Sequence, residues 1–163
     1  MKKNKISLKN KMLFYLFMFS GLLVFIDQYI KNWIVKHLNL NESFILIHKT
    51  VKIVNVRNYG AAFSLLFKKT GFLIIFSILV ISIFTVYMLK NKIKDRIYLI
   101  SMILIISGGI GNLIDRIKRG YVVDYIDLIF KPFDFIPVFN FADCLVLLGT
   151  TIFLIKFIKN EFF

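Results

Sequence analysis

The sequence predicts an all-α membrane protein: a bundle of four transmembrane helices with a small extracytoplasmic β-rich element and loops. The 163-residue chain is 58% hydrophobic and contains 19 phenylalanines, and its mean hydropathy is +0.76. Its apolar residues also gather into four long runs. A water-soluble domain of this length exposes too much surface to hide so many apolar side chains. We therefore expect one integral membrane domain over residues 1–163.

Each apolar run is long enough to cross a bilayer, because about 20 helical residues span a hydrocarbon core of about 30 Å. The expected spans are about 12–30, 71–89, 97–114 and 141–158, and the expected long connections are about 31–70 and 115–140. The first long connection is rich in Ile and Val, which predicts two short strands near Phe44–His48 and Val51–Val56. Pro132 and Pro137 exclude a continuous helix in the second.

The positive charges predict the orientation of the chain. Five lysines precede the first span, and four basic residues lie in or beside the short connection between the second and third spans. Because Lys and Arg concentrate in cytoplasmic loops, we expect both termini in the cytoplasm and the two long connections outside. Six of the seven aspartates then lie at or beyond the outer boundary: Asp27, Asp115, Asp124, Asp127, Asp134 and Asp143.

The net charge of +13 does not indicate a nucleic-acid partner. The basic residues are scattered between apolar runs and line no face with interleaved aromatics, whereas anionic lipid headgroups would attract them. The single cysteine, Cys144, cannot form an intramolecular disulfide. His37 and His48 have no further ligand type at metal-site spacing. We expect neither a metal nor a cofactor.

Two of these aspartates are candidates for chemistry. Asp124 follows the apolar stretch that leaves the third span, and Asp143 lies where the fourth span begins. If these spans are antiparallel neighbours, the two carboxyls converge and share one proton. Such a pair can activate a water molecule and donate a proton to a carbonyl oxygen. On the residues alone, three alternatives stay open: Asp143 only caps a helix, Asp124 belongs to a turn, or Asp127 takes its place.

Five short motifs occur along the chain: Asp27-Gln28-x-x-Lys31, Asn58-x-Gly60-Ala61-Ala62-Phe63-Ser64, Gly108-Gly109-x-Gly111-Asn112-x-x-Asp115-Arg116, Val122-Val123-Asp124 and Phe139-Asn140-x-Ala142-Asp143. Together and in this order, they resemble the bacterial lipoprotein signal peptidase (signal peptidase II) family over nearly the whole chain. The resemblance implies an intramembrane aspartyl endopeptidase. Such an enzyme removes the signal peptide of prolipoproteins, cutting before the cysteine that carries diacylglyceryl. The family's catalytic aspartates fall on Asp124 and Asp143, which favours Asp124 over Asp127.

The resemblance also implies partners and a location. The expected substrates are prolipoproteins that carry diacylglyceryl-cysteine, in contact with membrane lipid, and the expected inhibitor is the cyclic depsipeptide globomycin. We expect a monomer in the bacterial cytoplasmic membrane, with its active site near the outer face. One departure is Cys144, where family members more often carry Ser or Ala. We interpret it as a packing residue, and the reactivity of its thiol stays open.

Polar residues of the motifs are expected to support the catalytic pair. Asp27 and Lys31 lie four residues apart on one helix face, which predicts an ion pair. Asn112 and Asp115 share a face of the third span and are expected to hydrogen-bond across helices, since polar groups at membrane depth need partners. Arg116 is expected to pair with Asp115 or with a lipid headgroup.

The other motif residues are assigned by resemblance or by size. By resemblance, Asn58 and Asn140 line the site together with Asn112, and Ala142 belongs to the last motif. Gly108 is small enough to let two helices approach closely, and Gly60 is expected to allow a turn.

Two other classes of protein also use four spans with membrane acids. A small proton-coupled transporter usually places its ionisable groups near the midplane and often contains internal repeats, and neither feature is seen here. An assembly factor that only binds lipidated precursors needs no convergent carboxyls. A peptidase is therefore the predicted function.

Overall fold

A computed structural model describes residues 2–60, 69–90 and 95–162. Within these residues the chain forms four α-helices, three strands and one short 3₁₀ helix. The elements are α1 (Lys2–His37), β1 (Ser43–Ile47), β2 (Val51–Asn58), α2 (Thr70–Lys90), α3 (Arg96–Arg119), β3 (Val122–Leu128), η2 (Phe133–Phe135) and α4 (Phe141–Phe162). The four α-helices are long and apolar enough to cross a membrane. The predicted fold class is confirmed.

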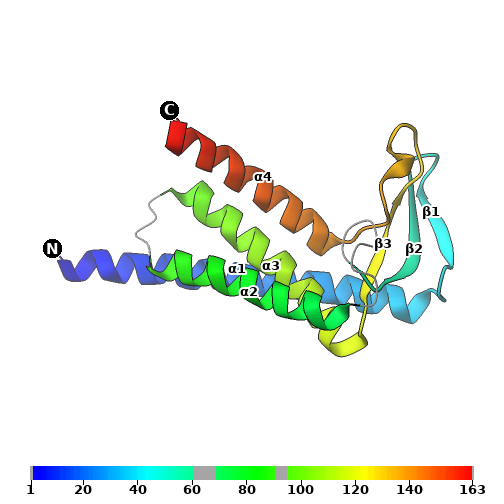
Figure 1. Cartoon of the computed structure of the whole chain (residues 1–163), viewed down its shortest axis with the longest axis horizontal. Helices are drawn as coiled ribbons and strands as arrows, with labels where there is room; N and C mark the ends of the chain where they lie inside the picture. The colour runs from blue at the N-terminus through cyan, green and yellow to red at the C-terminus, as the bar shows by residue number, and fades with distance from the viewer. Residues whose placement is uncertain (1, 61–68, 91–94, 163) are drawn as a thin grey trace.

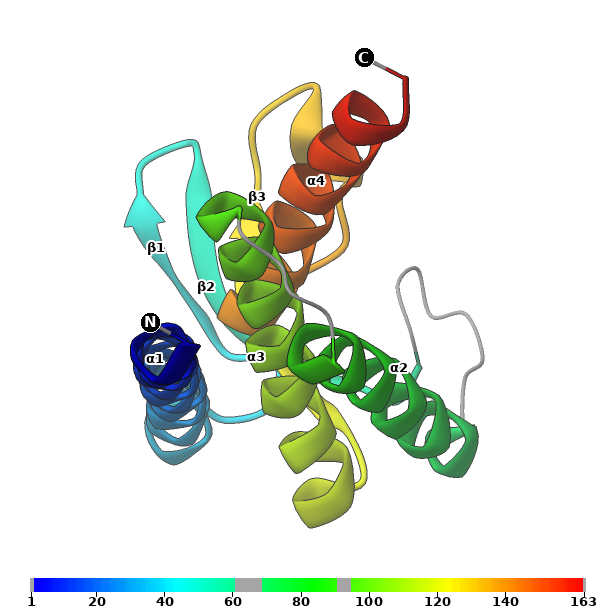
Figure 2. The ribbon, with the colours of Figure 1, turned by 90° about the vertical axis from the view of Figure 1, so that its left-hand side faces the viewer.

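The helices lie side by side, with α3 at the centre of the bundle. Figure 2 shows α3 between α1, α2 and α4, and it contacts all three. Its contact with α4 is close: a Cβ on Gly108 would lie 2.3 Å from the carbonyl oxygen of Ala142, and one on Gly149 would lie 2.7 Å from that of Ser101. Small residues of this kind let membrane helices pack backbone against backbone.

Helix α1 is longer than its predicted apolar span. Its 36 residues correspond to about 54 Å of helix, whereas a bilayer core is about 30 Å thick. The helix therefore continues past the apolar run at both ends, and Asp27 and Lys31 lie one turn apart on regular helix near its carboxyl end.

A three-stranded antiparallel sheet in the order β1-β2-β3 lies across one end of the bundle. In Figure 1, α1 begins and α4 ends at the opposite end. The cluster of Ile34, Ile53, Val123 and Tyr125 holds the sheet against α1. In the register of β2 and β3, Val56 pairs with Asp124 and Asn58 pairs with Val122. Asn58 is thus a diagonal neighbour of Asp124 on one face of the sheet.

The strand β3 is absent from the sequence prediction, which places only two strands and treats residues 115–140 as loops. Residues Val122–Tyr125 are all buried, so both faces of the strand are covered and the alternation of apolar and polar residues is lost. Gly120 ends α3 with a φ of 77°, and its N–H donates to the carbonyl oxygen of Arg116. Glycine tolerates this left-handed conformation, so the chain leaves α3 and enters β3 within two residues.

Candidate active site

Asp124 lies on β3 and is almost completely buried, with 2% of its surface exposed. Its Oδ2 accepts a hydrogen bond from Asn58 Nδ2 at 2.9 Å, and its Oδ1 accepts one from Asn140 Nδ2 at 2.6 Å. Burial, followed by the negative charge of Asp143, raises the pKa of Asp124 to about 7. This carboxyl is therefore poised to hold or release a proton near neutral pH.

Asp143 lies in the first turn of α4, in a reciprocal cap with Asn140. Asn140 Oδ1 accepts from the Asp143 N–H at 3.0 Å, and Asp143 Oδ2 accepts from the Asn140 N–H at 3.1 Å. This is the geometry of a capping box. Asp143 Oδ1 also accepts from Asn112 Nδ2 at 2.8 Å. Asp143 can thus cap α4 and still belong to the site, because its capping partner Asn140 also contacts the carboxyl of Asp124.

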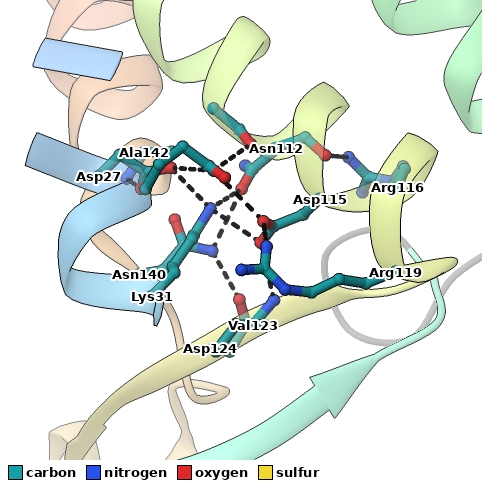
Figure 3. A network of polar contacts seen from close by, with 12 residues as sticks. Asp27, Lys31, Asn112, Asp115, Arg116, Arg119, Val123, Asp124, Asn140 and Ala142 are labelled. Carbon is teal, nitrogen blue, oxygen red and sulfur yellow. Dashed lines mark hydrogen bonds and ion pairs between the residues drawn. The ribbon is translucent and has the colours of Figure 1, made fainter. Parts of the chain in front are cut away.

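Lys31 lies at the centre of the polar network, with none of its side chain exposed. In the described structure its Nζ lies 2.9 Å from Asp27 Oδ2, 2.9 Å from Asn112 Oδ1 and 3.3 Å from Asp115 Oδ2. Figure 3 shows these contacts. An ammonium group has three N–H donors, so these acceptors satisfy it. Because Asn112 Oδ1 faces Lys31, its Nδ2 must point to Asp143.

Asp27 joins α1 to the start of α4. Its Oδ1 accepts from the Ala142 N–H at 3.1 Å. A Cβ on Gly111 would lie 2.5 Å from Asp27 Oδ2, so the approach of this carboxylate to α3 requires glycine. Gln28 Nε2 lies 3.1 Å from both Asp27 Oδ2 and the carbonyl oxygen of Gly111. The close approach at Gly111 is that expected of a small residue in a membrane helix, whereas sequence reasoning gave Gln28 no role, although Gln28 stands inside the first motif.

Asp115 is fully buried, and its arginine partner is Arg119. The expected partner, Arg116, is one residue along the helix. Residues at i and i+1 point in different directions, whereas those at i and i+4 share a face, so the spacing itself could have identified Arg119. The other Asp115 carboxyl oxygen, Oδ2, accepts from the Val123 N–H at 3.0 Å. This bond ties α3 to the residue that precedes Asp124.

Arg116 contacts backbone instead of the carboxylate. Its Nη2 donates to the carbonyl oxygen of Gly60 at 3.1 Å, and its Nη1 lies 3.4 Å from that of Asn112. The Gly60 N–H donates to Asn58 Oδ1 at 2.9 Å. This contact orients the Asn58 amide so that its Nδ2 faces Asp124. Residues 61–64 of the second motif lie outside the described residues.

The arrangement is thus two carboxyl groups around Asn140, held by a buried network from α1, α3, α4 and the sheet. Comparison with known proteins gives it a family. The model of the family described as Signal peptidase (SPase) II matches residues 19–159. This chain belongs to the signal peptidase II family.

Individual relatives agree with this assignment. The lipoprotein signal peptidases of Buchnera aphidicola subsp. Schizaphis graminum and Streptococcus agalactiae serotype V are 42% and 41% identical to it, and each alignment covers 86% of this chain and 89% of the relative. A bacterial membrane enzyme solved by the in meso method at 2.3 Å superposes with a TM-score of 0.84 at 28% identity, covering 91% of this chain and 90% of that one. A second, solved at 1.9 Å, gives 0.81 at 29% identity, with coverages of 90% and 94%.

Membership of the signal peptidase II family confirms the resemblance found in the motifs. It makes this multi-pass membrane protein a peptidase, which sets aside the transporter and the assembly factor. Two residues lie apart from the network in this family member. Asp127, the competitor of Asp124, pairs with Lys52 across the sheet at 2.8 Å. Cys144 is exposed, so its interpretation as a packing residue is wrong.

Proposed function

We propose that this protein removes the signal peptide from diacylglyceryl-modified prolipoproteins, cutting before the lipidated cysteine, with Asp124 and Asp143 as the catalytic pair. The family and the names of its relatives, lipoprotein signal peptidases, support a lipoprotein substrate. The observation that carries the catalytic assignment is Asn140. Its side-chain amide and its backbone N–H donate to one carboxyl each, so the two acids flank a single residue.

Asp124 holds a proton in the resting enzyme and serves as the acid, and Asp143 serves as the base. Two features support this division. Asp124 is buried, and its pKa is about 7. Asp143 is partly exposed in the first turn of α4, where the helix dipole favours an anion, and both of its oxygens accept N–H donors.

In the first step, Asp143 takes a proton from water as the water oxygen attacks the scissile carbonyl carbon. Asp124 gives its proton to the carbonyl oxygen, which yields a tetrahedral diol. In the second step, the carbon–nitrogen bond breaks as Asp143 passes its proton to the leaving nitrogen. Asp124 recovers a proton from one diol hydroxyl. The signal peptide leaves with a new carboxyl group, the cysteine gains a free amine, and both aspartates return to their starting states.

The enzyme acts at the outer face of the bacterial cytoplasmic membrane, with both termini inside. The basic residues at the end of the bundle opposite the sheet support this orientation. The substrate's acyl chains remain in the bilayer, so the membrane presents the scissile bond at a fixed depth, and this orientation contributes to the rate. Asn58, Asn112 and Asn140 of the same chain donate to the catalytic pair, and the working unit proposed here is a monomer.

A cleavage assay with purified protein in detergent tests the proposal. The substrate is a synthetic peptide with a diacylglyceryl-cysteine, and mass spectrometry locates the cut. Asp124→Asn and Asp143→Asn are each expected to lower kcat by about 10³-fold or more, and globomycin is expected to block the wild type. Asp127→Asn makes the same substitution on the same strand and is expected to cleave normally.

The outcomes separate the parts of the proposal. Wild-type rates for either catalytic variant would refute the role of that aspartate. Equal cleavage of the same peptide without its lipid would refute recognition of the diacylglyceryl group. Both variants are isosteric with aspartate, so a loss of activity without a loss of folded protein, checked by thermal unfolding, isolates the chemistry.

A further inference from the structure

Asp115 is the point where three elements meet beside the catalytic strand. In the described structure its carboxylate accepts hydrogen bonds from Gln28 of α1, from Arg119 of α3 and from the backbone of Val123 on β3, and it forms an ion pair with Lys31 of α1. Since Val123 immediately precedes Asp124, the position of the Asp115 carboxylate sets where the backbone of β3 lies. A shift of this carboxylate would move the catalytic carboxyl with it.

Arg119 holds the Asp115 carboxylate from the side of the helix end. Its Nη1 donates to Asp115 Oδ1, while its Nη2 donates to Asn32 Oδ1 on α1. The planar guanidinium therefore links the last turn of α3 to α1 through two different nitrogen atoms. Figure 3 shows the Arg119 side chain extending from the end of α3 towards Lys31 and β3.

Arg119 also completes the charge balance of the network. Asp27 and Asp115 are fully buried carboxylates, and Lys31 is a fully buried cation that contacts both. Arg119, whose side chain is 16% exposed, supplies the second positive charge. Without it, two buried carboxylates would share one lysine, and the excess negative charge would be costly because the site is buried away from water.

We propose that Arg119 is a positioning residue for the catalytic pair: through Asp115 and the Val123 N–H, it fixes the strand that carries Asp124. The proposal rests on the proposed function only in taking Asp124 as catalytic. It also gives different roles to the two arginines at this end of α3. Arg116 contacts the backbone that supports Asn58, whereas Arg119 controls the strand itself.

The charged groups that face Asp124 determine what the loss of Arg119 would do to it. They are Asp143 of α4, Lys31 of α1 and Arg116 of α3. In the wild type, Lys31 forms ion pairs with both Asp27 and Asp115. Removing Arg119 leaves Lys31 as the only direct cationic partner of both carboxylates among the described residues. The negative charge of Asp115, next to Val123, is then balanced by one cation fewer, and the pKa of Asp124 rises further.

The test compares Arg119→Gln, Arg119→Lys and Lys118→Gln in the cleavage assay, over a range of pH. We expect Arg119→Gln to lower kcat by about tenfold to a hundredfold through misplacement of β3, with KM within about twofold, because Arg119 touches no substrate. The pH–rate profile is expected to move towards higher pH by about half a unit, less than a directly adjacent charge would cause. Lys118 is exposed in the same turn, and Lys118→Gln is expected to behave as wild type.

Arg119→Lys separates charge from geometry. A lysine retains the charge but cannot donate to both Asp115 and Asn32 as a planar fork does, so we expect the wild-type pH profile with a kcat between those of wild type and Arg119→Gln. Asn32→Ala, at an exposed position, leaves both charges in place and is expected to lower kcat about twofold to fivefold. If Arg119→Gln does not fold, Asn32→Ala and Arg119→Lys still test the proposal.

The outcomes distinguish this inference from the proposed function. If Arg119→Gln and Asn32→Ala cleave as wild type while Asp124→Asn is inactive, the positioning role is wrong and the catalytic pair stands. A lower kcat in Arg119→Gln with an unmoved pH profile and no rescue by lysine would also overturn it, since a purely structural residue behaves in this way. Normal cleavage by Asp124→Asn would instead refute the proposed function.

Discussion

Asp124 is expected to make the free energy of unfolding of the wild type fall as the pH rises, whereas most surface carboxylates cause the opposite change. Replacing Asp124 by asparagine is expected to remove this fall. The pKa of Asp124 rises from 3.8 to about 7 in the folded protein. A raised pKa means that the folded state binds the proton more tightly than the unfolded chain does. The stabilising contribution is therefore complete below pH 3.8 and is lost as pH rises through 7.

The magnitude follows from the shift and the test interval. One pKa unit corresponds to 1.36 kcal/mol, so integration from pH 5 to pH 8 gives a loss of about 3 kcal/mol in the wild type. The asparagine variant does not titrate and does not incur this loss. It has one acceptor oxygen where Asn58 and Asn140 each donate to Asp124, which costs about 1–2 kcal/mol at every pH. The change of unfolding free energy with pH can thus be distinguished from the constant cost of the lost acceptor oxygen.

Thermal unfolding in detergent measures this difference, followed by the fluorescence of Trp33, the single tryptophan of the chain. For a domain of this length, about 2–4 °C accompanies each kcal/mol. The Tm of Asp124→Asn minus that of wild type should therefore increase by about 6–12 °C between pH 5 and pH 8. Asp127→Asn is the control, because Asp127 is partly exposed and paired with Lys52. A constant Tm difference for Asp124→Asn, or an equal trend in the control, would refute the reasoning.

Two further predictions concern the buried network. Lys31→Met leaves the carboxylates of Asp27 and Asp115 buried without their shared cation and should lower the free energy of unfolding by about 3–5 kcal/mol. Adding Asp27→Asn to this variant should recover part of the lost Tm. If it recovers none, buried charge is not the cause of the loss. Gly111→Ala places a Cβ 2.5 Å from Asp27 Oδ2 and should cost about 1–3 kcal/mol and lower cleavage. Gly21→Ala, with open space around its Cβ, should raise stability by up to about 1 kcal/mol, and equal losses in both glycine variants would contradict the packing explanation.

Local sequence determined the helices and most of the candidate site. A membrane helix satisfies its own backbone hydrogen bonds, so hydrophobic length alone predicts where it lies, and all four predicted spans fall within observed helices. The pairing of Asp27 with Lys31 was also predictable, because both lie on one helix at a fixed spacing. The motifs identified the family for a similar reason, since they are short and continuous in the chain.

The contacts between elements required the tertiary structure. The contact of Asn140 with Asp143 is local to the start of α4, but the chain gives no local signal that Asn140 also donates to Asp124, because that contact depends on how β3 and the start of α4 meet. The strand β3 itself was hidden because it is buried on both faces. The same holds for Lys31, which reaches Asn112 and Asp115 of another helix.

The aspartates show most clearly which properties the sequence determined and which depended on the folded structure. The sequence by itself determined that six of seven lie at one end of the molecule, because charges at the membrane boundary follow from the positions of the apolar runs. Only the folded structure decided their different states: Asp124 buried between two amides, Asp115 ion-paired with Arg119, and Asp127 paired on the sheet. The physical reason is that burial and charge pairing depend on neighbours distant in sequence, which a linear pattern does not specify.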